Sequence, residues 1–589
     1  MSAADSSHPD RGSFRARFRR AAGPTLVINV AALLAAVTAA VAGPSAPGTT
    51  AAVVAIAVLA WVEARRGGKL ARLLASHVLA RALLITSAVA LAAVGGSSLL
   101  VPAVMLGIST LLEPVLKRIL AGAVPYAAQL PGIRTRNHEL ASPAGVAVGN
   151  MGGLAVLFVT DLLAIRSDAV SWSVAILAVA SMLFAVVLAV DGVQRIRARR
   201  VADRTVNDAM RAYAPAFAVH WDAGPGTGYQ LAMWLPYLER IGEPFVIILR
   251  NQATFDETVG LTDRPVLLRK THADLDDMIV PTLRAAFYVN NAVRNAQFVR
   301  FAELWHVQLN HGESDKAPSY NPVLRAYDRN FVAGQAAVDR FAAHGLATAP
   351  EYFEIIGRPQ LEHVRQADGP LPAVPTVLYA PTWAGFNADS AYSSLGVGPE
   401  LVTQLVERGC RVLFRPHPYT DRSPELAAAA DTVRALLEAD EAKTGIGHEF
   451  GERVASELTI AECFNLADAL VSDVSSVVPD FLFSGKPFAI STMLAPAEEF
   501  IDGYAIAAAG YVFEPTPESI RAALDDMLGV DTKQAARAVA KEYYLGGESP
   551  ESVSARFIEA AREVIAMPKP PAIEAAREAD HASARGEGR

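Results

Sequence analysis

Four short loops carry most of the residues that could do chemistry, and each loop directly follows an apolar run. Their histidine, arginine, serine and threonine side chains are suited to binding phosphates, moving protons or stabilising negative charge. The residues are His311 and Lys316 in the first loop, Thr382 and Trp383 in the second, Arg415 and His417 in the third, and Asp473, Ser475 and Ser476 in the fourth.

The first loop contains Asn310, His311 and Gly312. Glycine permits a tight backbone there, so the imidazole would project from the end of the strand. A histidine near its ordinary pKa of about 6.5 suits general-base catalysis. His306 lies within the preceding strand, and we expect it to pack in the core. The alternative is that His311 lies on a turn and has no chemical role.

The second and third loops contain prolines that stiffen their backbones. In the second, Thr382 could hydrogen-bond a phosphate and Trp383 could cover a base or a sugar; a rigid turn with an anchoring tryptophan is the alternative. In the third, prolines on both sides of His417 fix its direction, and Arg415 lies beside it. An arginine with a histidine suits a phosphate or pyrophosphate leaving group.

The fourth loop places Ser475 and Ser476 at the start of a predicted helix that runs to Ser484. Free N–H groups and the helix dipole favour an anion at such a position, and the hydroxyls add donors. Ordinary capping by Asp473 or a serine is the alternative. A glycine-rich segment over 222–229 matches neither a dinucleotide nor a P-loop pattern, and in a two-domain transferase it would wrap the acceptor.

These loops must be positioned by a sheet, because strand and helix patterns alternate from about residue 210 onward. That alternation predicts parallel sheets with right-handed crossovers, and two series of it predict two Rossmann-like domains over 210–365 and 366–567 that face a cleft. A tail over 568–589 has no apolar periodicity and is predicted to be disordered. The predicted strands are Phe217–His220, Pro244–Leu249, Val266–Leu268, Ala286–Val289, His306–Leu309, Asn330–Val332, Tyr352–Ile356, Thr376–Tyr379, Arg411–Arg415, Ala469–Val471, Pro487–Ile490 and Tyr511–Phe513.

The first third of the 589-residue chain has a different composition. Residues 1–200 contain 19 basic and 8 acidic residues, whereas the remainder carries a net charge of −19. An acidic remainder gives no support to nucleic-acid binding. A helix needs roughly 20 apolar residues to span a bilayer. About six apolar stretches of about this length or somewhat shorter predict an α-helical membrane domain over 21–195. The stretches are Pro24–Ala42, Thr50–Val62, Val78–Val94, Ser97–Leu116, Val146–Ile165 and Ala169–Val190.

Basic residues cluster in the alternate connections of this domain, including the N-terminal segment 1–20 and the segment after residue 194. The positive-inside rule therefore predicts that the N-terminus and everything after residue 195 are cytoplasmic, in a multi-pass protein of the plasma membrane. Basic connections would also favour anionic lipid headgroups.

In this order, the four loops resemble motifs of the CDP-glycerol glycerophosphotransferase family, which includes teichoic-acid-type polymerases and primases. The matching segments are His311-Gly312 with Lys316, Tyr379-Ala380-Pro381-Thr382-Trp383, Arg415-Pro416-His417-Pro418 and Ser472-Asp473-Val474-Ser475-Ser476. The resemblance covers about residues 300–530. The first motif departs from the family, because Asn310 replaces a tryptophan and Glu313-Ser314-Asp315 replaces a Thr-Pro-Leu run.

The resemblance implies a GT-B fold and transfer of glycerol phosphate, or a related alditol phosphate, from a CDP-alcohol to a lipid-linked or polymer hydroxyl, with CMP as the leaving group. It implies that His311 is the general base. His417 and Arg415 would stabilise the pyrophosphate, and Ser475, Ser476 and Thr382 would bind the donor phosphates. Asp473, Trp383 and Lys316 would have supporting roles.

Two other functions compete with this interpretation. A GT-B enzyme could instead transfer a sugar from a sugar nucleotide, since fold does not fix function. Alternatively, the membrane domain could belong to a transporter or sensor that carries a degenerate transferase domain. No cluster of His, Asp and Glu has metal-ligand spacing, so the sequence requires no cofactor and shows no ligand set for a divalent ion at the donor phosphates.

Overall fold

The computed structural model describes residues 77–570 apart from short gaps at 95–97, 125, 137–139, 163–166, 225, 316, 368, 386–390, 548 and 550–551, together with a few positions between 26 and 57. The predicted basic N-terminus and the tail after residue 570 lie outside the described residues. The chain divides into two compact units, one of Met1–Tyr126 with Arg134–Thr205 and one of Ala127–Ile133 with Val206–Arg589.

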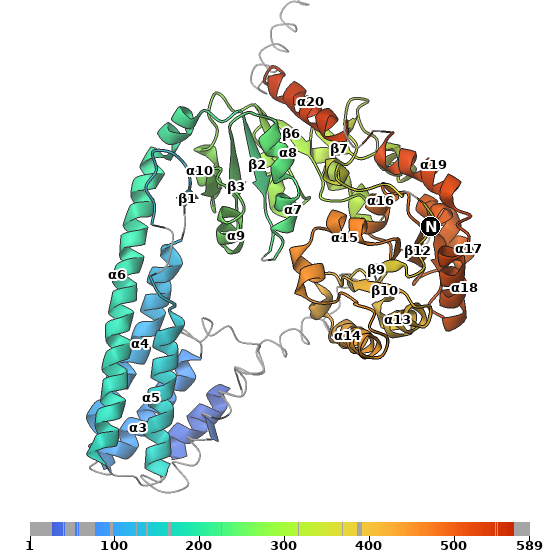
Figure 1. Cartoon of the computed structure of the whole chain (residues 1–589). Coiled ribbons are helices and arrows are strands. Elements are labelled where there is room, and N and C mark those ends of the chain that lie inside the picture. Colours follow the sequence, from blue (N-terminus) through green and yellow to red (C-terminus); the bar gives the residue numbers. More distant parts are fainter. Residues whose placement is uncertain are drawn as a thin grey trace, which may run out of the picture. The chain divides into compact units, whose positions relative to one another are not determined.

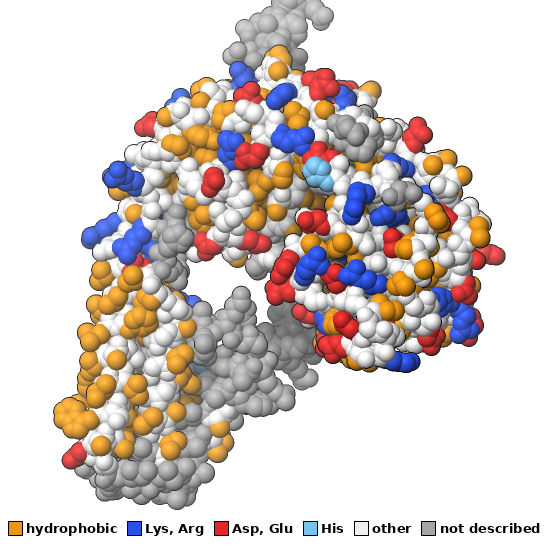
Figure 2. Space-filling view, in the orientation of Figure 1, with side chains coloured by type: hydrophobic (Ala, Val, Ile, Leu, Met, Phe, Trp, Pro, Cys, Tyr) orange, Lys and Arg blue, Asp and Glu red, His pale blue; other side chains and the backbone are white. Residues whose placement is uncertain are grey.

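The first unit is helical, and large apolar side chains cover its outside. On α4 (Leu100–Gly122) and α6 (Asp168–Tyr213), the side chains of Leu111, Trp172 and Leu183 are 61–69% exposed. Figure 2 shows this apolar surface on the helices. The interior contains apolar residues such as Leu106 and Phe158 as well, together with a few buried polar ones such as Glu113 and Asn150. Large apolar side chains that are also exposed on the outside are typical of a surface that faces lipid.

Glycines on α5 (Ala144–Leu162) let the helices of this unit approach closely. A Cβ atom at Gly145 would lie 2.7 Å from the ring of Phe184, and one at Gly149 would lie 2.3 Å from the Ser181 hydroxyl. Both neighbours belong to α6. Small residues at helix contacts are typical of helix pairs that associate within lipid.

The number of predicted spans requires correction. Among the described residues, two helices, α4 and α6, are long and apolar enough to cross a bilayer, rather than about six. The apolar parts of α3 (Val78–Val94) and α5 are shorter. At 1.5 Å per residue such segments fall short of the roughly 30 Å hydrocarbon layer. The first predicted stretch is described as a helix only over Ile28–Thr38, and most of Thr50–Val62 lies outside the described residues.

The second unit begins with an eight-stranded sheet in the order β1-β4-β3-β2-β5-β6-β7-β8. Figure 1 labels β2, β3, β6 and β7 of this sheet. Strands β2 to β8 run parallel, as predicted, and β1 is an antiparallel edge strand that the sequence did not reveal. The strands are β1 (Ala127–Ala128), β2 (Phe217–Trp221), β3 (Phe245–Leu249), β4 (Val266–Leu268), β5 (Ala285–Tyr288), β6 (Trp305–Gln308), β7 (Arg329–Val332) and β8 (Phe353–Ile355).

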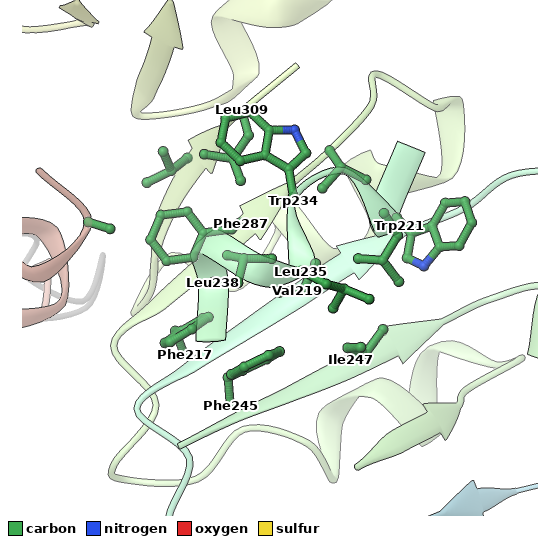
Figure 3. Close-up of a cluster of buried hydrophobic side chains, with 14 of the residues drawn as sticks. Phe217, Val219, Trp221, Trp234, Leu235, Leu238, Phe245, Ile247, Phe287 and Leu309 are labelled. Atoms are coloured by element: carbon green, nitrogen blue, oxygen red, sulfur yellow. The ribbon is translucent and has the colours of Figure 1, made fainter. Parts of the chain in front are cut away.

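Aromatic side chains fill one face of this sheet (Figure 3). The Phe217 ring stacks on Phe245 with centroids 4.9 Å apart and meets the edge of Phe287 at 5.3 Å. Trp221 and Trp234 are fully buried in the same cluster. Each such side chain contributes roughly 1.5–3 kcal/mol by leaving water. This core fixes the strand ends from which the functional loops emerge.

The second sheet has five parallel strands in the order β10-β9-β11-β12-β13. All twelve predicted strands in the two sheets are present, with ends displaced by no more than one or two residues. The strands are β9 (Thr376–Ala380), β10 (Arg411–Phe414), β11 (Ala469–Ser472), β12 (Phe488–Ser491) and β13 (Tyr511–Phe513).

Helices pack on both sheets. Around the first sheet they are α7 (Tyr229–Ala232), α8 (Leu235–Arg240), α9 (Phe255–Val259), α10 (His272–Asp276), α11 (Ala296–Val299) and α12 (Gln335–Ala343). Around the second they are α13 (Gly398–Glu407), α14 (Pro424–Thr444), α15 (Ile460–Leu466), α16 (Val477–Leu482), α17 (Ala497–Gly503), α18 (Pro517–Leu528) and α19 (Gln534–Leu545). The last helix, α20 (Val553–Ala566), returns to the first sheet, where Phe557 and Val564 join its core. The sequence had placed that segment in the second domain.

Candidate active site

The first loop turns sharply after β6. Asn310 has a φ of 56°, a left-handed conformation that asparagine adopts more readily than most residues. Its carbonyl oxygen accepts a hydrogen bond from the indole of Trp234 (2.6 Å), and its side-chain amide donates to Asn330 (2.9 Å). An asparagine in place of the family's tryptophan therefore suits this backbone turn, which directs His311 out of the line of the strand.

The contacts of His311 define its tautomer. Its Nδ1 lies 3.2 Å from the carbonyl oxygen of Val289, which can only accept, so Nδ1 carries the proton and Nε2 keeps its lone pair. Desolvation, with the positive charge of Arg358 in addition, lowers the pKa of His311 to about 4. The imidazole is therefore neutral at pH 7 and can take up a proton at Nε2.

The first loop lies against the start of α16, which belongs to the other sheet domain. A Cβ atom at Gly312 would lie 2.7 Å from the Cβ atom of Ser476, so only glycine fits there without movement. Arg358 links the same two elements. Its guanidinium donates to the carbonyl oxygen of His311 (3.3 Å) and to both carboxylate oxygens of Asp480 on α16 (2.9 and 3.1 Å).

The acidic residues that depart from the family pattern are used to anchor this loop. Asp315 accepts hydrogen bonds from Arg340 on α12 (2.9 Å) and from the Tyr544 hydroxyl on α19 (2.7 Å). Arg340 also donates to Glu313 at 3.3 Å. The Arg340 guanidinium is buried, and pairing with these carboxylates raises its pKa although burial opposes this shift.

Aromatic contacts bring the second and third loops together. Trp383 stacks on His417 with ring centroids 6.1 Å apart and meets Tyr419 edge-on at 5.4 Å. The backbone N–H of Tyr419 donates to Nδ1 of His417 (3.0 Å). The proton of a neutral His417 therefore lies on Nε2, so this ring is a hydrogen-bond donor. The two histidines thus hold opposite tautomers, one fit to accept a proton and one fit to donate.

Asp473 joins the second loop to the fourth. Its carboxylate is buried and accepts hydrogen bonds from the Thr382 backbone N–H (2.7 Å) and the Ser491 hydroxyl (2.8 Å). Burial raises its pKa, and these hydrogen bonds oppose the rise. These contacts favour a structural role, in which Asp473 holds the second and fourth loops in fixed positions relative to each other.

Arg415 contacts the backbone of the segment that precedes α15. One guanidinium nitrogen donates to the backbone carbonyl oxygens of Val454 and Leu458 and lies 3.6 Å from the sulfur of Cys463. This nitrogen supports the neighbouring backbone, and the phosphate-binding role of Arg415 stays a prediction. The orientation of a long side chain depends on such tertiary contacts, which the motif could not reveal.

The two serines of the fourth loop lie at the start of the short helix α16. The Ser475 hydroxyl accepts a hydrogen bond from the N–H of Val477 (3.3 Å), which is ordinary capping. Ser476 precedes the helix without a side-chain capping bond, and both serines are partly exposed. Ser476 is therefore the serine whose hydroxyl is not used in closing the helix.

The structure thus gathers all four loops through contacts of Gly312 with Ser476, Thr382 with Asp473, and Trp383 with His417. Lys316 lies outside the described residues. Sequence reasoning missed Arg358 as a link between the two sheet domains. Among the described residues, no group of three His, Cys, Asp or Glu side chains could hold a metal ion.

Two α/β sheets, with the candidate loops at the carboxyl ends of their parallel strands, define a GT-B-like architecture. Residues 363–493, in the second sheet domain, match the family described as CDP-Glycerol:Poly(glycerophosphate) glycerophosphotransferase. That segment contains the second, third and fourth loops. No curated protein sequence matches the chain.

Several solved structures align with part of the chain at low identity. The wall teichoic acid polymerase TagF aligns with 12% identity over 62% of this chain and 92% of its own, with a TM-score of 0.41. A UDP-N-acetylglucosamine 2-epimerase from Listeria monocytogenes aligns with 12% identity over 59% and 96%, with a TM-score of 0.41. MurG from Acinetobacter baumannii aligns with 12% identity over 59% and 100%, with a TM-score of 0.39.

Proposed function

We propose that the chain transfers glycerol phosphate, or a related alditol phosphate, from a CDP-alcohol to a hydroxyl of a lipid-linked or polymer acceptor and releases CMP. The product would be a teichoic-acid-like polymer of the cell envelope. The observation that supports this proposal is the close approach of Gly312, in the loop that carries the neutral His311, to Ser476 at the start of α16, in a chain whose residues 363–493 match the glycerophosphotransferase family.

The reaction we propose is a single displacement at phosphorus. The acceptor oxygen bonds to the phosphorus that carries the alditol, and the bond from that phosphorus to the bridging oxygen of CMP breaks. Nε2 of His311 takes the proton of the acceptor hydroxyl. A positioned base of this kind contributes about 10²–10⁴-fold in rate.

The leaving CMP gains negative charge, and donors from the second domain would stabilise it. The Nε2–H of His417 is suited to this role because the Tyr419 N–H donates to Nδ1, which leaves the ring proton on Nε2. The hydroxyl of Ser476 is suited to it because it makes no capping bond to α16. Thr382 and Ser475 would assist at the donor phosphates. Trp383, held by its stack on His417, would cover the nucleotide.

We further propose that the helical unit anchors the enzyme in the plasma membrane. Its apolar outer surface, its close glycine contacts and the two long helices α4 and α6 support this part of the proposal. The basic residues on one side of the predicted spans favour a cytoplasmic catalytic domain. A cytosolic nucleotide donor and a lipid-linked acceptor would then meet at that face.

The test is CMP release by the full chain in lipid nanodiscs, with CDP-glycerol and a polyprenyl-linked acceptor. His311→Ala should reduce acceptor-dependent release by about 10²–10⁴-fold while CDP-glycerol still binds. His417→Ala should also abolish release. His363→Ala is the matched control, because the His363 side chain is 85% exposed. Wild-type turnover in His311→Ala would refute the role of this base.

A panel of donors separates the alternatives. Release of CMP from CDP-glycerol or CDP-ribitol supports the phosphotransferase, whereas release of UDP from a UDP-sugar would identify a glycosyltransferase. Binding of CDP-glycerol without turnover across many acceptors would indicate a degenerate, non-catalytic domain.

A further inference from the structure

A basic cavity lies in the first sheet domain, away from the donor motifs. It has a volume of about 450 Å³, and its lining consists of Arg250, Asn251, Gln252, Lys270 and Arg294. Arg250 directly follows β3, Lys270 follows β4, and Arg294 lies in the segment after β5. The cavity is therefore at the carboxyl ends of parallel strands, where open α/β sheets bind ligands.

Arg250 is held in place with unused donors. Arg250 is 7% exposed. Its Nη2 donates to the Lys270 carbonyl oxygen at 2.8 Å, which orients the guanidinium group. Nε and Nη1 are buried and have no hydrogen-bond partner among the described residues. Leaving buried charged donors unpaired is costly, so such an arrangement is typical of a site that a ligand completes.

The local electrostatics point to an anion. Burial and the nearby charge of Arg294 lower the pKa of Arg250, although the carboxylates of Asp222 and Asp274 partly oppose this shift. Burial and the charge of Arg250 also lower the pKa of His220, on β2, to about 3. Three cationic side chains, Arg250, Lys270 and Arg294, line the cavity, and Asp222 lies 3.6 Å from Arg294.

The position of the basic cavity relates it to the acceptor. The cavity and His311 lie on the same edge of the sheet, since His311 follows β6. Strands β3 and β6 are three strand spacings apart, which is roughly 14 Å. The glycine-rich segment is tied to the cavity, because Asn251 donates to the Ala223 carbonyl oxygen at 2.9 Å. An acceptor held at His311 would thus reach the cavity along the strand ends.

We infer that this basic cavity binds a phosphate or pyrophosphate group of the acceptor, set back by roughly 14 Å from the hydroxyl that reacts. The inference rests on the proposed function for the identity of the acceptor. The group recognised is the same whether it belongs to a lipid diphosphate or to a polymer phosphodiester.

The test measures binding without turnover, in the full chain in nanodiscs, by calorimetry. The probes are inorganic pyrophosphate, a soluble glycerol phosphate oligomer and a polyprenyl diphosphate in the bilayer. Arg250→Gln should weaken binding of the preferred probe by roughly 10–100-fold, as expected for the loss of charged hydrogen bonds. Arg294→Gln, at a half-exposed residue that is not part of the core, should weaken it in the same direction even if Arg250→Gln folds poorly.

Arg264→Gln is the control, because Arg264 precedes β4 at the opposite edge of the sheet and pairs with Glu239. Affinities of Arg250→Gln and Arg294→Gln equal to that of the control would overturn the inference. Binding of pyrophosphate alone, with neither the lipid nor the oligomer bound, would overturn the assignment to the acceptor. CDP-glycerol binding and CMP release, measured in parallel, report separately on the proposed function.

Discussion

The contact between Gly312 and Ser476 gives the sharpest test of how the two sheet domains meet. In Gly312→Ala the new Cβ atom would lie 2.7 Å from the Ser476 Cβ atom. Carbon atoms normally approach to 3.5–4.0 Å, so the loop and the start of α16 must separate by about 1 Å. A displacement of that size between reacting groups costs about 10²-fold in rate, or about 2.7 kcal/mol of activation free energy.

We therefore expect Gly312→Ala to lower kcat for CMP release by about 100-fold. The assay is acceptor-dependent release in nanodiscs, with Gly447→Ala as the control because an added Cβ atom there meets no atom within 4 Å. Ser476→Gly removes the clashing atom, so Gly312→Ala combined with Ser476→Gly should be no slower than Ser476→Gly alone. Additive losses in the double variant, or normal turnover in Gly312→Ala, would refute the reasoning.

Three further outcomes follow from the described contacts. Because only neutral His311 accepts a proton and its pKa is about 4, the acid limb of the kcat/KM profile should fall near pH 4, and a limb near pH 6.5 would contradict this environment. Asp473→Ala removes the acceptor of buried donors that include the Ser491 hydroxyl, and it should lower the free energy of unfolding by roughly 2–4 kcal/mol in chemical denaturation; unchanged stability would exclude the structural role. The buried Arg81 guanidinium donates to both oxygens of Glu113 (2.7 and 2.6 Å), so Arg81→Met alone should cost roughly 3–5 kcal/mol. Replacing both partners by methionine should restore part of this loss in thermal unfolding, because no unpaired charge remains although Asn150 loses its acceptor. A double variant as unstable as the single one would contradict the pairing.

The buried polar contacts inside the helical unit extend beyond the Arg81–Glu113 pair. Asn150 donates to Glu113 and the Ser109 hydroxyl donates to Asn150, each at 2.7 Å. A network with its donors and acceptors paired can lie among apolar helices at little cost, whereas one missing member leaves a charge exposed to hydrocarbon. This explains why the single and double variants should differ.

Strand positions were predictable because they depend on local pattern. Short apolar runs between polar turns predicted β9 and β11 as buried strands, and fully buried parallel strands have that composition. Loops at their carboxyl ends followed from topology alone. The candidate residues His311, Thr382 and His417 could therefore be named before their contacts were known.

Tertiary contacts decided what those residues can do. The tautomer of His311 depends on Val289, which is distant in sequence, and the direction of Arg415 depends on Val454 and Leu458. Arg358 became a link between domains only when Asp480 was placed beside it.

The sequence by itself determined where the strands and apolar helices form, since hydrophobic periodicity and turn residues act over a few neighbours. Apolar composition did not determine the length of each helix, so the sequence predicted about six membrane spans where two described helices are long enough. The return of α20 to the first sheet, the fit of Gly312 against Ser476 and the unpaired donors of Arg250 belong to the tertiary structure. They depend on packing between segments that are far apart in the chain, where shape and burial, rather than local preference, set the free energy.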